Sequence, residues 1–332
     1  MSARVLSAKD PGARREAGQL LRSGGIVAFP TETVYGLGAN AFDPEAVARV
    51  FAVKARPSLD PLIVHLADAS DADRVARADD PRVARLAARF WPGPLTLVLP
   101  RRPGVPDIVT AGLDTVAIRV PDHEDALALL REAGTPLAAP SANPFGYVSP
   151  TTARHVADLL GDSVDLVLDG GPCRVGVEST VLSLVGPAVI LRPGGVSRER
   201  LERELGTPLA VTGSAERPRA PGQLLRHYAT RTPLRILDGP AAVLPPPGGR
   251  VGLLAFRAAP GGSGWAVVEV LAPDGRATTA AARLFAALRR LDAAGLDAIL
   301  AEPCDEGGLG LAIMDRLRRC AARSGEPPQP LP

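Results

Sequence analysis

The stretch 26–66 constrains the fold more than any other part of the chain, because it joins two apolar runs through one helical segment. The first run, Ile26 to Phe29, predicts a short strand. Asp43 followed by Pro44 predicts a helix start, since an acid at the N-cap and a proline at the first helical position are both favoured. A second strand is predicted at Pro61 to Leu66. Strand, helix and strand in this order are typical of an α/β fold.

Polar side chains collect at the ends of these elements. Thr33 lies in the turn after the first strand, Lys54 and Arg56 lie where the helix ends, and His65 lies at the end of the second strand. Element ends are where α/β proteins usually build binding sites. Taken singly, a basic helix end is more typical of a solvated surface than of a site, and a histidine on an apolar strand is equally typical of a core. We expect both cations to end an exposed helix and to face one ligand.

Periodicity and turn signals predict further elements up to residue 206. The predicted helices cover 10–23, 71–78, 80–90, 122–133, 149–160 and 197–205, and the predicted strands cover 95–99, 115–120, 137–140, 164–168, 180–185 and 188–191. We therefore expect residues 1–206 to form one α/β domain with its own core.

The remainder of the chain predicts a linker and a second domain. Residues 207–233 show no convincing periodicity and are rich in Gly, Pro, Arg and Ser, which is typical of a linker. Residues 234–325 alternate strands and helices, and we expect a small, Rossmann-like α/β domain there. The Pro-rich tail, 326–332, is expected to be disordered.

Arg119 lies in an apolar run that predicts a central strand. With a period of two, Thr115, Ala117 and Arg119 share one face of that strand. An arginine there needs an anionic partner, because an unpaired buried charge is costly. The partner is either a ligand or an internal carboxylate, and the pattern leaves both open.

Other polar side chains flank predicted strands in the same domain. Ser141 and Asn143 follow one strand, Ser179 precedes another, and Arg192 follows a third, where its guanidinium could bind a phosphate. Ordinary loop chemistry explains each of them singly. Together, several cations and hydroxyls at element ends suit a phosphorylated ligand bound without a P-loop.

Composition excludes several classes of protein. The net charge of +2 over 332 residues gives no global field for nucleic acid or membrane, and the aromatic content of 4% is low for an RNA-binding module. The three cysteines form no CxxC pair and fit a reducing cytosol. We expect no signal peptide and no membrane span. No Walker A pattern is present, the histidines lack metal-ligand spacing, and Gly36 to Ala41 matches a dinucleotide fingerprint only weakly.

A set of ordered motifs carries a family resemblance over residues 10–205. In chain order they read FPTETVYGLG, KARP, PLIVH, TVAIRVP, APSAN, GVESTV and LRPGG. Together they closely resemble the threonylcarbamoyl-AMP synthase family, the YrdC-type enzymes. Three later motifs, RHYA, VGLLAF and GLGLAIMDRL, resemble the long, two-domain branch of that family.

The resemblance implies a fold and an activity. The expected fold is a YrdC-like twisted α/β sheet with a basic, concave cavity. The expected reaction makes threonylcarbamoyl-AMP from ATP, L-threonine and bicarbonate, with Mg²⁺ accompanying the ATP and pyrophosphate released. A downstream tRNA threonylcarbamoyl-transferase complex is the expected consumer of the product, in the cytoplasm, without stable nucleic-acid or membrane binding by this chain.

The resemblance also implies residue roles. The residues that match threonine-binding positions are Thr33, His65, Arg119, the main chain of Ala139, and Ser179. The residues that match ATP-binding positions are Arg56, Thr115, Ser141, Asn143, Ser149, Arg192 and Tyr228. Lys54 and Arg56 are the implied catalytic pair. Asp60 stands where many relatives have an ATP-contacting asparagine, and a carboxylate there is expected to repel phosphate unless it faces another part of the ligand.

Two other functions fit parts of the same pattern. A non-catalytic, RNA-binding YrdC-like module would show salt-dependent RNA affinity without nucleotide turnover. Carbamoyl adenylation, as in hydrogenase maturation factors, would need zinc-finger cysteines and an acylphosphatase module, neither of which this sequence contains.

Overall fold

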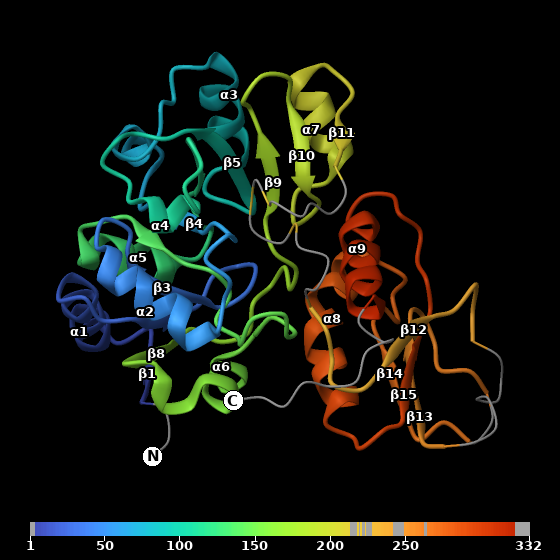
Figure 1. The fold of residues 1–332 in the computed structure, drawn as a ribbon. Coiled ribbons are helices and arrows are strands. Elements are labelled where there is room, and N and C mark those ends of the chain that lie inside the picture. The colour runs from blue at the N-terminus through green and yellow to red at the C-terminus, as the bar shows by residue number, and fades with distance from the viewer. Residues whose placement is uncertain are drawn as a thin grey trace. The chain divides into compact units, whose positions relative to one another are not determined.

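A computed structural model describes residues 4–212, 218, 220, 223, 228–241, 249–261 and 264–322 (Figure 1). The chain divides into two compact units. The first unit contains residues 1–145 and 149–224, and the second contains residues 225–332 together with the short segment Gly146–Val148. Part of the predicted linker and the whole predicted tail lie outside the described residues.

The first unit is built on one large mixed sheet. Its described strands run in the order β1-β8-β2-β3-β7-β4-β6-β5-β9-β10-β11. Their bounds are β1 Val5–Ser7, β2 Val27–Phe29, β3 Gly36–Asn40, β4 Ile63–His65, β5 Leu95–Pro100, β6 Thr115–Arg119, β7 Leu137–Ala138, β8 Leu166–Asp169, β9 Thr180–Ser183, β10 Val189–Arg192 and β11 Ala210–Val211.

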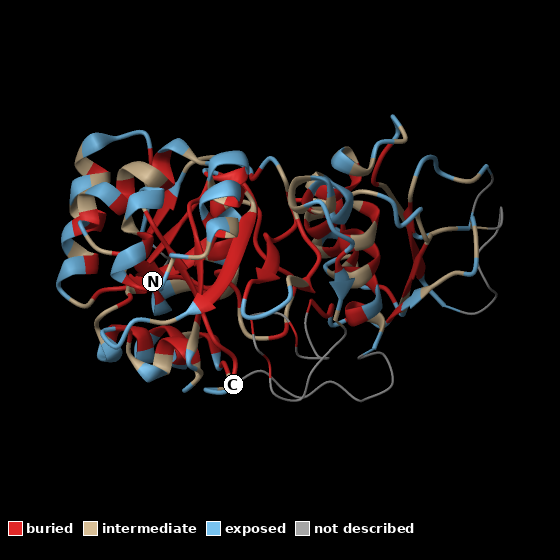
Figure 2. Ribbon diagram, turned by 90° about the horizontal axis from the view of Figure 1, so that it is seen from above, coloured by how far each residue is buried: buried red, intermediate tan, exposed pale blue. Residues whose placement is uncertain are grey.

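Helices cover both faces of this sheet. Their bounds are α1 Pro11–Arg22, α2 Pro44–Lys54, α3 Pro81–Phe90, α4 Asp107–Thr110, α5 Glu124–Ala133, α6 Ala153–Leu160 and α7 Arg198–Leu205, with 3₁₀ turns at Ala69–Arg74 and Gly161–Ser163. One apolar cluster joins α1 and α5 to one face, and another joins α2, α3 and α6 to the opposite face. Figure 2 shows the strands buried between helices that are exposed on their outer sides.

Three of these helices begin with the same local signal. Asp10, Asp43 and Asp80 each accept hydrogen bonds from main-chain N–H groups of the first turn, and each is followed by proline. The acid satisfies donors that the helix itself leaves unpaired, while proline has no N–H to satisfy. This is why helix starts were predictable from sequence.

The second unit is a four-stranded parallel sheet with order β12-β15-β13-β14. Its strands are β12 Leu234–Ile236, β13 Val251–Ala255, β14 Val267–Val270 and β15 Ala298–Ala301, and its helices are α8 Ala277–Asp292 and α9 Gly310–Ala321. Helix α8 packs on β13 and β14, and α9 packs on β12. The α/β class predicted for both parts of the chain is confirmed.

One local expectation was wrong, and one weak motif match has no structural support. The weak match is the dinucleotide fingerprint: Gly36–Asn40 forms strand β3, paired antiparallel with β2, so it does not open a helix as such a fingerprint must. Gly38 is required there because a Cβ would lie 2.8 Å from the ring of Phe29. The helix expected at 71–78 is a 3₁₀ turn at Ala69–Arg74. No helix in the described ranges is both long and apolar enough to cross a bilayer.

Candidate active site

All but one of the fourteen predicted site residues belong to the first unit, and most lie at element ends. Lys54 ends α2, with Arg56 and Asp60 just beyond it; His65 ends β4; Thr115 and Arg119 begin and end β6; Ala139, Ser141 and Asn143 follow β7; Ser179 precedes β9; and Arg192 ends β10. Thr33 lies between β2 and β3, and Ser149 precedes α6. The exception is Tyr228, which belongs to the second unit.

Arg119 is held by three parts of the first unit. Its Nη2 lies 2.6 Å from a carboxylate oxygen of Glu32, its Nη1 donates to Thr33 Oγ1 at 3.0 Å, and its Nε donates to Gly93 O at 3.2 Å. Arg119 is 3% exposed and Glu32 is fully buried. The anionic partner that the sequence left open is therefore an internal carboxylate. A guanidinium has five N–H groups, so these contacts do not exhaust its donors.

His65 lies beside Arg119 because β4 and β6 pair in parallel with these two residues in register. Burial lowers the pKa of His65 to about 3, and the charge of Arg119 adds to the effect. The ring meets Phe29 edge-on, with the centroids 6.0 Å apart. Among the described residues its Nδ1 has no hydrogen-bond partner. The imidazole is therefore neutral at physiological pH, and it can orient a ligand by hydrogen bonding but not by charge.

Ser179 connects the two predicted groups of ligand residues. Its hydroxyl is 2.7 Å from that of Thr96 and accepts from Arg192 Nη2 at 3.1 Å, while its main-chain oxygen accepts from the same nitrogen at 2.8 Å. The main chain at Glu178 and Ser179 lies so close to residue 194 that only glycine fits there, because a Cβ at this position would lie 2.3 Å from the main-chain oxygen of Glu178. The structure thus brings Ser179, which is predicted to bind threonine, into contact with Arg192, which is predicted to bind ATP.

Lys54 does not end an exposed helix, which corrects the expectation from sequence. It is 1% exposed, and its Nζ donates to Ser141 O at 2.5 Å and to Asn143 O. Ala55 takes a left-handed conformation, with φ of 49°, and ends the helix there. Burial and the neighbouring charge of Arg56 lower the pKa of Lys54. The ammonium group therefore fastens the turn at residues 141–143 to the end of α2.

Arg56 is also buried, and it forms an ion pair with Asp60, with Nη2 and Oδ2 2.9 Å apart. Its Nε and Nη2 additionally donate to the main-chain oxygens of Asp60 and Pro61. Burial raises the pKa of Asp60, although the charges of Arg56, Lys54 and Arg192 oppose that rise. Asp60 thus lies among three cations, and their charge compensates a carboxylate that the sequence predicted to be repulsive.

The remaining predicted residues are more scattered. Ser149 donates from its hydroxyl to Glu178 Oε1 at 2.6 Å, and both are buried. Thr115 is half-buried where β6 pairs with the end of β5. In the second unit, the ring of Tyr228 stacks on Phe285 at 5.6 Å and lies 4.8 Å from the guanidinium of Arg316.

Two carboxylates of this region were missed. Glu32 pairs with Arg119, and Glu178 binds the hydroxyl of Ser149. Their sequence signal was present: each stands among hydroxyl and small residues next to a buried strand, where a carboxylate needs a partner. Nothing local identified which cation or hydroxyl that partner would be.

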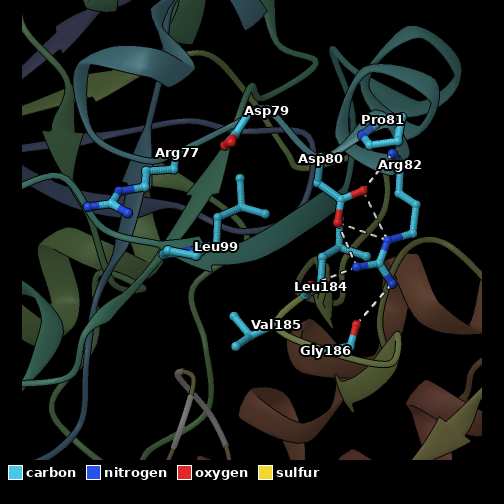
Figure 3. A pocket seen from close by; sticks show the side chains of 10 residues that line it. Arg77, Asp79, Asp80, Pro81, Arg82, Leu99, Leu184, Val185 and Gly186 are labelled. Carbon is cyan, nitrogen blue, oxygen red and sulfur yellow. Dashed lines mark hydrogen bonds and ion pairs between the residues drawn. The ribbon is translucent and has the colours of Figure 1, made fainter.

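A separate hollow of about 500 Å³ lies elsewhere on the first unit, and none of the fourteen residues lines it (Figure 3). Some of the charged side chains that line the hollow are already paired with each other. Arg82 binds the carboxylate of Asp80 and the main-chain oxygens of Leu184 and Gly186. Arg77 and Asp79 add one charge of each sign to its lining. The hollow therefore does not provide the concentrated positive charge that a triphosphate requires.

Comparison with known proteins identifies relatives over nearly the whole chain. A family model described as "Telomere recombination", for the Sua5, YciO and YrdC proteins, matches residues 19–194, and one described as "Threonylcarbamoyl-AMP synthase, C-terminal domain" matches residues 196–322. The threonylcarbamoyl-AMP synthase of Pyrococcus abyssi is 43% identical, covering 92% of this chain and 93% of that protein. The Bacillus subtilis synthase is 45% identical, covering 95% and 94% respectively.

The fold agrees with these sequence matches. The crystal structure of P. abyssi Sua5 complexed with L-threonine superposes with a TM-score of 0.86 and 41% identity, and the match covers 94% of each chain. The family resemblance predicted from the motifs is thereby confirmed, and the chain belongs to the threonylcarbamoyl-AMP synthase family, in the form that carries the additional C-terminal domain.

Proposed function

We propose that this chain synthesises L-threonylcarbamoyl-AMP from L-threonine, bicarbonate and ATP and releases pyrophosphate. The reaction transfers an adenylyl group, so the enzyme is a nucleotidyltransferase. The observation that carries the proposal is the contact at Ser179, where the residues proposed for threonine meet the guanidinium of Arg192, proposed for ATP. Full-length similarity to synthases from two organisms supports the same activity.

The proposed mechanism begins at the threonine amine. In its unprotonated form it attacks the carbon of CO₂ or bicarbonate, giving an N-carboxylate together with water from bicarbonate, or with a proton released to solvent from CO₂. Arg119 would hold the amino acid's own carboxylate with N–H groups not used by Glu32, Thr33 and Gly93, a task suited to the guanidinium fork. Neutral His65 would orient the amino acid from the adjacent strand. No general base is assigned.

The second step is the attack of the N-carboxylate oxygen on the α-phosphorus of ATP. The new P–O bond forms as the bond to the β-phosphate oxygen breaks, and pyrophosphate leaves. Positioning and charge compensation carry most of such a reaction. We assign charge compensation to Arg56 and Arg192. Lys54, whose ammonium binds main-chain carbonyls, would act by holding the turn that carries Ser141 and Asn143.

Mg²⁺ is proposed to enter as part of the MgATP substrate. In the described part of the chain no group of three or more His, Cys, Asp or Glu side chains could hold a metal ion. Asp60, the carboxylate among the proposed phosphate-binding cations, is fully buried and paired with Arg56. These residues do not fit a metal held by the protein itself, and we derive no step through one.

The product is a mixed anhydride, and we propose that a tRNA-modifying threonylcarbamoyl-transferase complex consumes it. The proposed compartment is the cytoplasm, where the three cysteines, all free, are stable as thiols.

One incubation tests the proposed activity. The full chain is supplied with MgATP, L-threonine and bicarbonate, and products are identified by mass spectrometry. We expect threonylcarbamoyl-AMP and pyrophosphate in equal amounts, with neither formed when threonine or bicarbonate is omitted. Pyrophosphate release that is independent of both would contradict the proposal, as would RNA binding without any turnover.

A further inference from the structure

The segment Gly146–Val148 connects two proposed ATP residues yet belongs to the second unit. Asn143 precedes it by three positions and Ser149 follows it directly, and both of these lie in the first unit. Asn143 is fastened at one end by Lys54, which binds its main-chain oxygen. Ser149 is fastened at the other end by its 2.6 Å hydrogen bond to Glu178. The path of the chain between these two anchors therefore depends on how the second unit holds residues 146–148.

Residues 146–148 are held both through their main chain and through the ring of Tyr147. Gly146 O accepts from Ala229 N at 2.8 Å, Tyr147 forms an isolated β-bridge with Ala229, and Val148 O accepts from Arg289 Nη2. The ring of Tyr147 lies 5.1 Å from the guanidinium of Arg289. Because Arg289 lies in the last turn of α8, one helix end supplies contacts to two adjacent residues of the segment.

A side-chain contact adds specificity to this grip. The hydroxyl of Tyr147 donates to Asp292 Oδ2 at 2.6 Å, and Asp292 Oδ1 accepts from Thr232 N at 2.8 Å. Asp292 is the last residue of α8. A carboxylate is unfavourable at a helix C-terminus, where the unpaired carbonyls carry partial negative charge. Its presence there is offset by these two donors, so the position is occupied by a group whose role is to bind Tyr147 and Thr232.

We propose that Tyr147 and Asp292 are positioning residues of the ATP site, and that their hydrogen bond makes the second unit a working part of nucleotide binding. The bond fixes residues 146–148 between two anchors of the first unit, which are Phe145 N on Lys54 O at 2.8 Å and Ser149 on Glu178, and through these it adjusts the placement of Asn143 and Ser149. This inference rests on the proposed function, which assigns those two residues to ATP. The C-terminal domain would then take part in ATP binding by placing residues of the first unit.

The test uses the full chain and two single variants. Tyr147→Phe removes only the hydroxyl and keeps the ring beside Arg289, while Asp292→Asn removes the charge of the acceptor. A hydrogen bond to a charged group is typically worth enough to change affinity about tenfold when lost. We expect the KM for ATP to rise about three- to tenfold in each variant, with the KM for threonine within about twofold of wild type. The double variant should be no worse than either single variant, because both remove the same bond.

Direct binding of the α,β-methylene analogue of ATP separates this inference from the proposed activity. If the wild type forms no threonylcarbamoyl-AMP but binds the analogue, and the variants bind it more weakly, the proposed function fails and the inference stands. A matched control is Glu269→Gln. It breaks the ion pair between Glu269, in β14, and Arg290, in α8, without changing a residue that contacts residues 146–148. The control should bind the analogue like wild type.

Two outcomes would overturn the inference. One is wild-type affinity for the analogue in both variants, accompanied by a lower melting temperature, which would leave the bond a purely structural role. The other is an equal loss of affinity in the Glu269→Gln control, which would show that any disturbance of α8 has the same effect.

Discussion

Arg119 and Glu32 form an enclosed ion pair, with Nη2 and Oε2 2.6 Å apart and side chains that are 4% and 0% exposed. The guanidinium proposed to hold the carboxylate of threonine therefore already has an internal counter-charge. Breaking such a pair by removing one partner is strongly destabilising, because the other charge stays buried without compensation. The pair fixes Arg119 in place before any substrate arrives, and the substrate carboxylate must then bind a guanidinium whose charge is already compensated.

Glu32→Gln tests this relationship. Glutamine keeps an oxygen that can accept from Arg119 but removes the negative charge. We expect the free protein to lose about 3 kcal/mol of unfolding free energy. We also expect threonine to raise the melting temperature more in the variant than in wild type, because the substrate carboxylate supplies the missing charge. Differential scanning fluorimetry with and without threonine measures both effects.

The control for that experiment is Glu204→Gln, which breaks the exposed pair between Arg85 and Glu204. Exposed pairs contribute at most about 1 kcal/mol, so this variant should stay close to wild type. A threonine-induced shift in Glu32→Gln that is smaller than in wild type would mean that Glu32 supports the ligand in another way.

His65 predicts a pH dependence of stability. Its pKa is about 3 in the folded protein, against 6.5 for an unperturbed histidine. Between these values the unfolded chain binds a proton that the folded chain does not, so stability rises with pH up to about 6.5 and is level above it. From pH 7 to pH 5 this residue should cost about 2 kcal/mol of unfolding free energy. Urea unfolding at pH 7 and pH 5 should show that His65→Gln loses about 2 kcal/mol less unfolding free energy over this range than the wild type does. Equal losses in the two proteins would contradict a neutral, buried His65.

Local signals explain how far the sequence predicted this molecule. Helix starts at Asp43 and Asp80 were found because capping is a short-range effect. The burial of Lys54 was not found, because it depends on a left-handed turn at Ala55, a residue that gives no turn signal, and on carbonyls 87 and 89 positions away. The motif resemblance placed candidate ligand residues, but it could not say which of their polar groups were already bound to each other.

Asp60 gives a prediction about ATP affinity. Arg56 stays in place without the carboxylate, because it also donates to the main-chain oxygens of Asp60 and Pro61 at 3.1 and 2.9 Å. Asp60→Asn should therefore leave the cation positioned but less compensated, and ATP should bind about three- to tenfold more tightly, with threonine affinity unchanged. Isothermal titration calorimetry measures both affinities. Asp79→Asn, an equal charge change at an exposed residue of the same unit, is the control and should have little effect. Weaker ATP binding in Asp60→Asn would indicate instead that the carboxylate itself accepts hydrogen bonds from the ribose or the base.

Lys54 distinguishes a positioning role from direct contact with phosphate. Lys54→Met keeps a stem of similar length but removes the Nζ donor that the main-chain oxygens of Ser141 and Asn143 share, while Ser141 O still accepts from Asn143 N at 3.0 Å. Losing buried hydrogen bonds of this kind costs about 1–3 kcal/mol, so we expect a loss of about 3 kcal/mol in unfolding free energy by urea titration. We expect ATP affinity to fall at least about tenfold in the same variant, because the turn that carries both proposed ATP residues is released. The only other lysine of the chain, Lys9, is exposed, and Lys9→Met should change neither quantity. A Lys54→Met protein of wild-type stability that had lost only ATP affinity would show that the ammonium group binds phosphate directly. Loss of both together would establish that Lys54 acts through the turn, and that the family's Lys-x-Arg and Ser-x-Asn signatures are two halves of one hydrogen-bonded unit.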